Sequence, residues 1–243
     1  MYLYDRTHSA NLGYDWMALT WQAIAHFNPI CLNLGGGHDC HPLPEYQHYV
    51  AVDLVPRSDF AVAQDLSQPI PLADGCVSRI LSEHFLEHVE VATIAHVLRE
   101  CHRLLKPGGV ARLAVPDYGH PRSRHCLVLG RDPNRHDHVT LLTYPMLSRL
   151  IEASPFRTGR FYHYWVGDRF VAERIDYSLG YVRRTPDNHP HNHCRGFRQK
   201  CGRIARDLGE YVRHGTRTTA LHLNTRRYHP LAVTSMVVDL VKS

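Results

Sequence analysis

Short apolar segments, repeated along residues 30–116, constrain the fold of this chain more than any other feature. The segments are 30–34, 49–54, 60–66, 77–84 and 110–116. An apolar run of this length, bounded by turn residues, is typical of a strand buried on both faces. An amphipathic helix predicted at 91–105 separates the last two of these strands. Strands alternating with helices predict a parallel α/β sheet covered on both faces, with ligands at the carboxyl ends of its strands.

The rest of the chain adds helices and two further strands. Apolar residues at helical spacing predict helices at 15–27 and 144–153. Strand-like residues follow at 158–165, and 232–241 is a strongly apolar strand. No internal repeat or low-complexity tract divides the 243 residues, so we expect a single domain over 1–243 with a helical extension at 1–29.

A glycine turn and an acidic residue follow the first two predicted strands. Gly35-Gly36-Gly37 would let the backbone turn sharply and approach a ligand closely. The nicotinamide-cofactor fingerprint needs glycine or alanine at its sixth position, where this chain has Cys40. Asp53 lies 18 residues after Gly35, where a carboxylate can accept both hydroxyls of a ribose. Together, the glycines and the acid favour nucleoside binding over a plain turn.

Polar residues also follow the third and fourth predicted strands. Asp65 could accept a hydrogen bond from an adenine amino group, although an isolated aspartate here more often caps a turn. Ser82-Glu83-His84 ends the fourth strand and faces the same edge of the predicted sheet.

Five segments in order resemble the successive motifs of class I S-adenosylmethionine-dependent methyltransferases. They are LNLGGG, VAVDL, QDLSQPIPLADG, ILSEHFLEHV and LRECHRLLKPGGVARLAVPD. The resemblance covers 30–118, and it is strongest to small bacterial enzymes with SEHFLEH before LKPGG. It implies a methyltransferase with S-adenosylmethionine as cofactor. It also implies a doubly wound, Rossmann-like sandwich with a mostly parallel, seven-stranded sheet and an antiparallel last strand at 232–241.

The same resemblance implies which residues hold the cofactor. Gly35 and Gly37 would line its methionine part, Asp53 would hold the ribose, and Asp65 with Leu66 would flank the adenine. The implied set is Asn33, Leu34, Gly35, Gly36, Gly37, Asp53, Leu54, Asp65, Leu66, Ser82, Glu83 and His84. Asn33 stands where many relatives have an acid, but its amide can still bond the cofactor's amino group.

Residues after the fifth predicted strand are candidates for acting on a methyl acceptor. A nucleophilic oxygen usually needs a base with a pKa near neutrality, which favours histidine. His138 matches a histidine that recurs in the resembling group, while the alternative for this stretch is a polar capping loop. We predict catalytic roles for His138, His136 and Asp117, and substrate contacts for Tyr118, His120, Arg195 and Arg198.

His84 and His88, four residues apart, are a further candidate for this catalytic role, but we interpret Glu87-His88 as a structural cap and core contact. A separate histidine cluster suggests metal ligands. Residues 189–194 hold three histidines and Cys194, which suit zinc or copper, yet their alternate spacing beside a proline is not a standard zinc pattern. The acidic spacing of a magnesium-dependent enzyme is not evident either, and we predict no metal site.

Positive charge is concentrated late in the chain. Residues 181–243 hold 12 of the 28 Lys and Arg residues but 4 of the 23 Asp and Glu residues. Nine of the basic residues lie in 195–227, within a stretch at 187–230 that we predict to be a basic insertion or lid. We favour an anionic small metabolite or saccharide as its partner. The alternatives are methylation of RNA or protein, or a non-catalytic member of the fold that binds the cofactor.

Cysteine usage and hydropathy give an expectation for location. The seven cysteines are odd in number and form no CxxC pair, which is typical of reduced thiols. The sequence shows neither a signal-peptide pattern nor an apolar run of about 18 residues. We therefore expect a cytoplasmic protein with no membrane partner, and we make no prediction for its oligomeric state.

Overall fold

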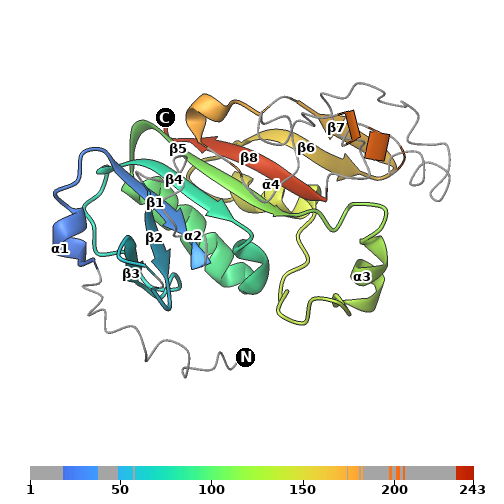
Figure 1. The fold of residues 1–243 in the computed structure, drawn as a ribbon, viewed down its shortest axis with the longest axis horizontal. Helices are drawn as coiled ribbons and strands as arrows, with labels where there is room; N and C mark the ends of the chain where they lie inside the picture. Colours follow the sequence, from blue (N-terminus) through green and yellow to red (C-terminus); the bar gives the residue numbers. More distant parts are fainter. Residues whose placement is uncertain are drawn as a thin grey trace.

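The structure, a computed structural model, centres on one eight-stranded sheet. It describes residues 19–37, 49–56, 58–173, 175–180, 182, 197–198, 201–202, 205 and 234–243. The strands are β1 (Ile30–Leu34), β2 (Val50–Asp53), β3 (Ala61–Ala63), β4 (Val77–Glu83), β5 (Leu105–Pro116), β6 (Arg160–Val166), β7 (Arg169–Ala172) and β8 (Ser235–Val241). Their order in the sheet is β3-β2-β1-β4-β5-β8-β6-β7 (Figure 1).

The first five strands form the parallel half of the sheet that the sequence predicts. Leu32 of β1 pairs with Val50 of β2, and Leu34 of β1 lies beside Ser82 of β4. Strands β1 and β4 are buried along almost their whole length, as their unbroken apolar runs require. Because these strands are parallel, their carboxyl ends meet at one edge of the sheet.

The other half of the sheet is antiparallel. Strand β8 inserts between β5 and β6 and runs antiparallel to both, which confirms the expected direction of the last strand. The sheet has one strand more than the seven expected, because β6 and β7 form a hairpin that turns at Gly167, whose φ is +53°. Strand β7 was not predicted from the sequence, since its four residues lie at the edge and show no marked apolar pattern.

Two helices pack on one face of the sheet. Helix α2 (Val91–Leu104) and helix α4 (Tyr144–Glu152) lie behind the strands in Figure 1. Ile94, Leu98 and Leu147 point from these helices into the main core. Each such apolar side chain stabilises the fold by about 1.5–3 kcal/mol through burial. Both helices confirm the predicted segments 91–105 and 144–153 to within one residue.

A buried ion pair holds the opposite face of the antiparallel half. Arg112 of β5 donates to both carboxylate oxygens of Asp239 on β8, at 2.7 Å each. Tyr162 of β6 donates to the same carboxylate at 2.6 Å. Arg112 also donates to the carbonyl oxygens of Asp176 and Gly180, which places the segment 175–180 with its 3₁₀ turn η4 (Tyr177–Leu179) over this face. The pair therefore joins three strands and a covering segment.

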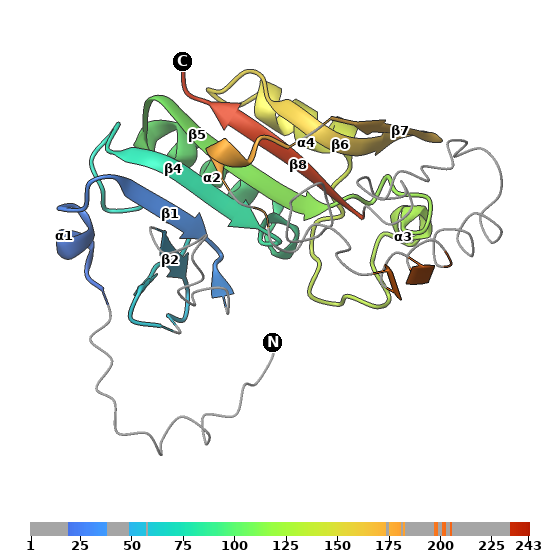
Figure 2. The same ribbon diagram turned by 45° about the horizontal axis from the view of Figure 1, so that its top comes forward.

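The remaining helices are short. Helix α1 (Trp21–Ile24) begins at its cap Thr20, whose Oγ1 accepts from the Ala23 N–H at 3.2 Å, and it is shorter than the 15–27 predicted, of which 15–18 lie outside the described residues. Helix α3 (Arg124–Leu129), which was not predicted, lies beyond the end of β5 in Figure 2. None of the helices in these ranges is long and apolar enough to cross a membrane.

Candidate functional site

The turn after β1 needs glycine for two independent reasons. Gly35 has φ +68°, and a Cβ placed on it would lie 2.5 Å from the Cβ of Phe85. A Cβ on Gly36 would lie 2.9 Å from that of Ala51. The N–H of Gly37 donates to Oδ2 of Asp53 at 2.9 Å. The predicted glycines and Asp53 are therefore brought together at the carboxyl ends of β1 and β2.

Buried residues of β1 and β4 border this turn. Asn33 and Leu34 are buried in β1, and Glu83 is buried at the end of β4. Ser82 is buried beside Leu34, and its Oγ has no hydrogen-bond partner among the described residues. A ribose-accepting carboxylate, a close-approach glycine turn and an orphaned hydroxyl at one strand edge are groups that a nucleoside-sulfonium cofactor can use. The residues present therefore fit the implied cofactor.

The other predicted cofactor residues differ in their exposure and in their contacts. Asp65 is exposed and accepts from the Ser67 N–H at 2.8 Å, and hydrogen bonds from Ser67 hold the pKa of the Asp65 carboxyl below its usual value. Its carboxylate thus caps its own turn. Leu66 packs into the core, while Leu54 is 69% exposed. A polar role in cofactor binding stays a prediction for Asp65.

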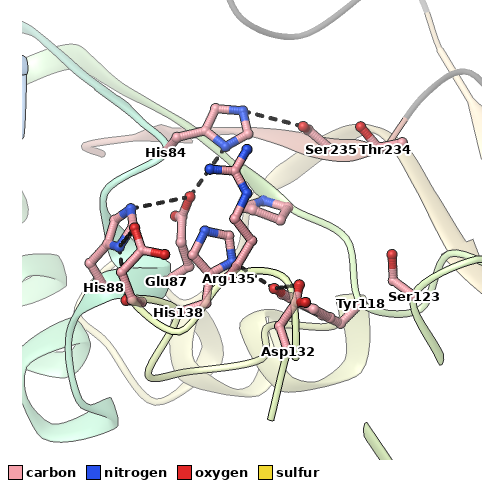
Figure 3. A pocket seen from close by; sticks show the side chains of 12 residues that line it. His84, Glu87, His88, Tyr118, Ser123, Asp132, Arg135, His138, Thr234 and Ser235 are labelled. Carbon is pink, nitrogen blue, oxygen red and sulfur yellow. Dashed lines mark hydrogen bonds and ion pairs between the residues drawn. The ribbon is translucent and has the colours of Figure 1, made fainter. Parts of the chain in front are cut away.

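A cleft of about 520 Å³ opens next to this edge, where β4 and β5 end and β8 begins (Figure 3). Its lining residues are His84, Glu87, His88, Pro116, Tyr118, Ser123, Asp132, Arg135, Asp137, His138, Thr234 and Ser235. The volume lies in the range of small-molecule sites, about 300–1,000 Å³. Predicted residues His84, Tyr118 and His138 lie in this cleft.

His84 turns the chain into the cleft with a conformation that is rare outside glycine. Its φ is +56°, and its N–H donates to the Ala114 carbonyl at 2.8 Å. Nδ1 lies 3.2 Å from Oε1 of Glu87, and Nε2 lies 3.3 Å from the Ser235 hydroxyl. Strained residues of this kind concentrate at functional sites. The contacts join β4 to the beginning of β8.

His138 is held by a chain of hydrogen bonds. The Tyr118 hydroxyl donates to Oδ2 of Asp132 at 2.8 Å and lies 2.6 Å from Nδ1 of His138. Because Tyr118 has given its only proton to Asp132, Nδ1 of His138 is the donor in the second bond. The lone pair of His138 is then on Nε2. Burial lowers the pKa of His138 and outweighs the opposing carboxylates of Glu87 and Asp137, so the imidazole is neutral at pH 7.

Glu87 and His88 lie beside His138, on the 3₁₀ turn η3 (Leu86–His88) that follows β4. Glu87 is 1% exposed, and its backbone carbonyl accepts from the N–H groups of Val139 and Thr140. These bonds dock the loop that carries His138 onto η3. The predicted structural role of Glu87 is confirmed for its backbone, whereas its side chain faces the cleft (Figure 3).

Asp117 and His120 are buried next to the cleft but do not line it. The two Asp117 oxygens accept from the N–H groups of Gly119 and Trp165, at 2.8 and 2.7 Å. Burial raises the Asp117 pKa to about 6 although these bonds oppose the rise. Nδ1 of His120 accepts from the Arg122 N–H at 3.1 Å. Both side chains thus organise the turn after β5, and their predicted catalytic and substrate roles stay predictions.

The remaining candidates lie away from the cleft or outside the described residues. His136 is exposed and is not among the residues that line the cleft. Arg198 is exposed in a short helical segment. Arg195, most of the basic stretch 187–230 and the cluster at 189–194 lie outside the residues that the structure describes.

Several cleft residues were not singled out from the sequence as functional. Among them are Glu87, His88, Asp132, Arg135 and Ser235. The last three lie in loops or at a strand start with no motif around them. Glu87 lies within the SEHFLEH motif, and this position was the signal that could have identified it.

Comparison with known proteins assigns both domain and fold. Residues 32–113 match the family model described as methyltransferase domain. A possible histamine N-methyltransferase of Thermotoga maritima, S-adenosylmethionine-dependent by its description, has a TM-score of 0.51 at 13% identity, over 91% of this chain and 86% of that one. A methyltransferase of Archaeoglobus fulgidus, also described as S-adenosylmethionine-dependent, has a TM-score of 0.47 at 14% identity. The similarity covers 87% of this chain and 85% of that one. No curated protein matches the sequence.

The family match spans β1 to most of β5, the strands whose carboxyl ends carry the glycine turn, Asp53 and His84. The structural similarity extends the assignment to the fold of the chain. The chain therefore contains a methyltransferase domain at 32–113 and has the fold of S-adenosylmethionine-dependent methyltransferases.

Proposed function

We propose that this protein transfers a methyl group from S-adenosylmethionine to an oxygen or nitrogen atom of a small, anionic metabolite or saccharide bound in the cleft. The observation that carries the proposal is the position of His138. This neutral histidine lines a cleft of small-molecule size, and the same edge of the sheet holds the glycine turn and Asp53.

The cofactor half of the proposal rests on the end of β1 and its neighbours. The backbone of Gly35 to Gly37 would line the methionine part, and the Asp53 carboxylate would accept the ribose hydroxyls. The unpartnered Ser82 hydroxyl would gain a partner there. When bound, the cofactor supplies a methyl group on a positively charged sulfur. The protein's contribution is to orient the acceptor against that group and to keep its nucleophilic atom deprotonated.

The acceptor half rests on the chemistry of the cleft. Its lining is mainly polar, with hydroxyl, imidazole and carboxylate groups that can bind the hydroxyls of a polar metabolite. Arg135 adds a guanidinium, which favours an acceptor that carries a carboxylate or phosphate. Neutral His138, fixed by Tyr118 and Asp132, is positioned to act on the proton of the acceptor's nucleophile.

Calorimetric titration with S-adenosylmethionine and S-adenosylhomocysteine tests the cofactor site. We expect saturable binding to the wild type and a loss of affinity of about 10-fold or more in Asp53→Ala, because the ribose loses a charged acceptor. Asp59→Ala removes an exposed aspartate nearby and should bind as the wild type does. Equal affinity in all three proteins would contradict the assignment of Asp53.

An acceptor screen tests the cleft separately. Release of S-adenosylhomocysteine is measured with panels of sugar acids, phosphorylated sugars and hydroxy acids. His138→Gln should lose about 10²–10⁴-fold in turnover while it keeps cofactor affinity. His125→Gln, on the exposed side of α3, is the matched control. Turnover that survives in His138→Gln would place the acceptor elsewhere, and methylation of RNA alone would replace the small-molecule proposal.

A further inference from the structure

Three side chains in the cleft converge on one point. Glu87, His88 and His138 each direct one ligand-type atom into a space where these atoms all lie within 4.8 Å of one another. The rings of His88 and His138 meet edge to face, with centroids 5.0 Å apart (Figure 3). Around a tetrahedral zinc ion with bonds of 2.0–2.1 Å, ligand atoms are about 3.3 Å apart. The three atoms therefore need to approach by at most about 1.5 Å to share an ion.

The two histidines present lone pairs and not protons to this point. Nδ1 of His88 lies 2.9 Å from the Asp137 carbonyl oxygen, which can only accept, so Nδ1 carries the proton. Nδ1 of His138 donates to Tyr118, as described above. Each Nε2 atom thus carries the lone pair that can bind a cation. Metal-binding histidines are oriented in the same manner, by a carbonyl or carboxylate group on the other ring nitrogen.

Glu87 supplies an independent sign that a group is missing. Its side chain is 1% exposed, and Oε2 has no hydrogen-bond partner among the described residues. Oε1 accepts from His84 at 3.2 Å, and it lies 3.9 Å from Nε2 of His88, too far for a hydrogen bond. A buried carboxylate oxygen without a partner is costly, and a cation between Oε2 and the two imidazoles would satisfy it.

The charges around the point favour a cation. The carboxylates of Glu87, Asp132 and Asp137 lie around it, and Asp137 Oδ2 is 3.5 Å from Nδ1 of His88. Among the described residues of the cleft lining, Arg135 carries the opposing charge. Three negative charges against one leave an excess there that attracts a divalent ion, and the bound ion would in turn let an anionic acceptor enter the cleft.

We infer that Glu87, His88 and His138 form a binding site for a divalent transition-metal cation of the zinc type. Two imidazoles and one carboxylate leave further coordination positions open, as in catalytic and not structural metal sites. The inference rests on the proposed function, because an acceptor oxygen in the same cleft would occupy an open position. His138 would then act on the acceptor through the ion, which lowers the pKa of a bound hydroxyl, whose proton leaves to water.

Zinc titration of the chelator-treated full-length protein tests the site without any acceptor. Calorimetry with Zn²⁺ and the visible absorption of Co²⁺ are measured on the wild type, Glu87→Gln, His88→Gln and the control His125→Gln. A fifth protein replaces His189, His191, His193 and Cys194 by alanine, because that cluster could bind zinc independently. We expect one equivalent of ion bound at Glu87, His88 and His138, lost in the first two variants and kept in the other two.

The possible outcomes separate the two proposals. If Glu87→Gln fails to fold, as judged by circular dichroism, His88→Gln still tests the metal site, because the His88 side chain is partly exposed and its replacement should not disturb the core. Zinc binding that is unchanged in His88→Gln, absent from the wild type, or lost only in the 189–194 variant overturns the metal site. Zinc bound at the site together with a failed acceptor screen would leave the metal site standing and remove the proposed acceptor class.

Discussion

The cofactor edge and the acceptor cleft of this protein are assembled in different ways. The cofactor edge comes from β1 and β2 and the turn between Leu34 and Gly37, with Phe85 packed against that turn. The cleft is assembled from η3, the loop at 132–138 and the beginning of β8, three segments that lie far apart in the sequence. His84 contacts Ser235 across a separation of 151 residues.

The difference shows how each region obtains its precision. At the cofactor edge, backbone conformation does the positioning, since a positive φ and a missing Cβ allow the close turn at Gly35. In the cleft, side chains position one another through Tyr118–His138, His84–Glu87 and His88–Asp137 contacts. The first region should respond to added bulk, and the second to pH and to single polar substitutions.

The largest effect is expected on stability, from a substitution that tests whether the parallel and antiparallel halves of the sheet unfold together. Arg112→Met leaves the Asp239 carboxylate buried without its charge partner and should lower the free energy of unfolding by about 3–5 kcal/mol. The double variant Arg112→Met/Asp239→Leu removes both charges and should recover most of the loss. Chemical denaturation followed by tryptophan fluorescence measures both. Two separate transitions would show that the halves of the sheet are independent.

Acidification should destabilise the antiparallel half of the sheet through His163. Its imidazole is buried in β6, and burial lowers its pKa to about 4, while it donates to the Ser235 carbonyl at 2.8 Å. The unfolded chain takes up a proton near pH 6.5, so stability is full above that pH and is lost as the pH falls towards 4. The loss at pH 4 is about 3 kcal/mol. In His163→Gln this part of the pH dependence should vanish from unfolding curves recorded between pH 7 and 4.

Added bulk at the cofactor edge should have a somewhat smaller effect. Gly35→Ala combines a left-handed backbone with a contact of 2.5 Å to Phe85 and should destabilise the protein by about 2–3 kcal/mol. Gly75→Ala is the matched control, because Gly75 has φ +67° but no atom within 4 Å of the added Cβ. It should lose only about 1 kcal/mol. Similar melting temperatures for the two variants would remove Phe85 from the explanation.

The smallest effect concerns the charge balance of the cleft. Arg135→Gln removes the positive charge that opposes the ion and should tighten Zn²⁺ binding about 3- to 10-fold. Exposed Arg131→Gln, outside the cleft lining, serves as the control and should change the affinity little. Competition with a chromophoric chelator gives both constants. Weaker binding in Arg135→Gln would mean that Arg135 orders the cleft and does not repel the cation.

Much of the fold could be predicted because its signals are local. The strands at 30–34, 77–84 and 110–116 and the helices at 91–105 and 144–153 each carry their own apolar pattern. Strand β7 and helix α3 were missed because four and six residues are too short for a periodic pattern, and their packing decides their structure.

The candidate site divides in the same way. Gly35, Gly37 and Asp53 could be located because strand ends and glycines mark them. Asp117 fits that sequence logic equally well, yet the fold turns its carboxylate towards two backbone N–H groups. The orientation of a side chain after a strand end depends on the segment that packs against it. For Asp117 this segment is β6, whose Trp165 donates to the carboxylate, and the sequence pattern does not contain this information.

The sequence by itself determined the parallel half of the sheet, the glycine turn and the acid that faces it, because hydrophobic periodicity and backbone freedom act over a few residues. Only the tertiary structure decided that Glu87, His88 and His138 meet, that Tyr118 and Asp132 set the tautomer of His138, and that Ser235 closes the cleft. These contacts depend on the crossing of β8 beside β5 and on the docking of the 132–138 loop onto η3. Distances between groups far apart in sequence follow from such packing and not from their own residue types.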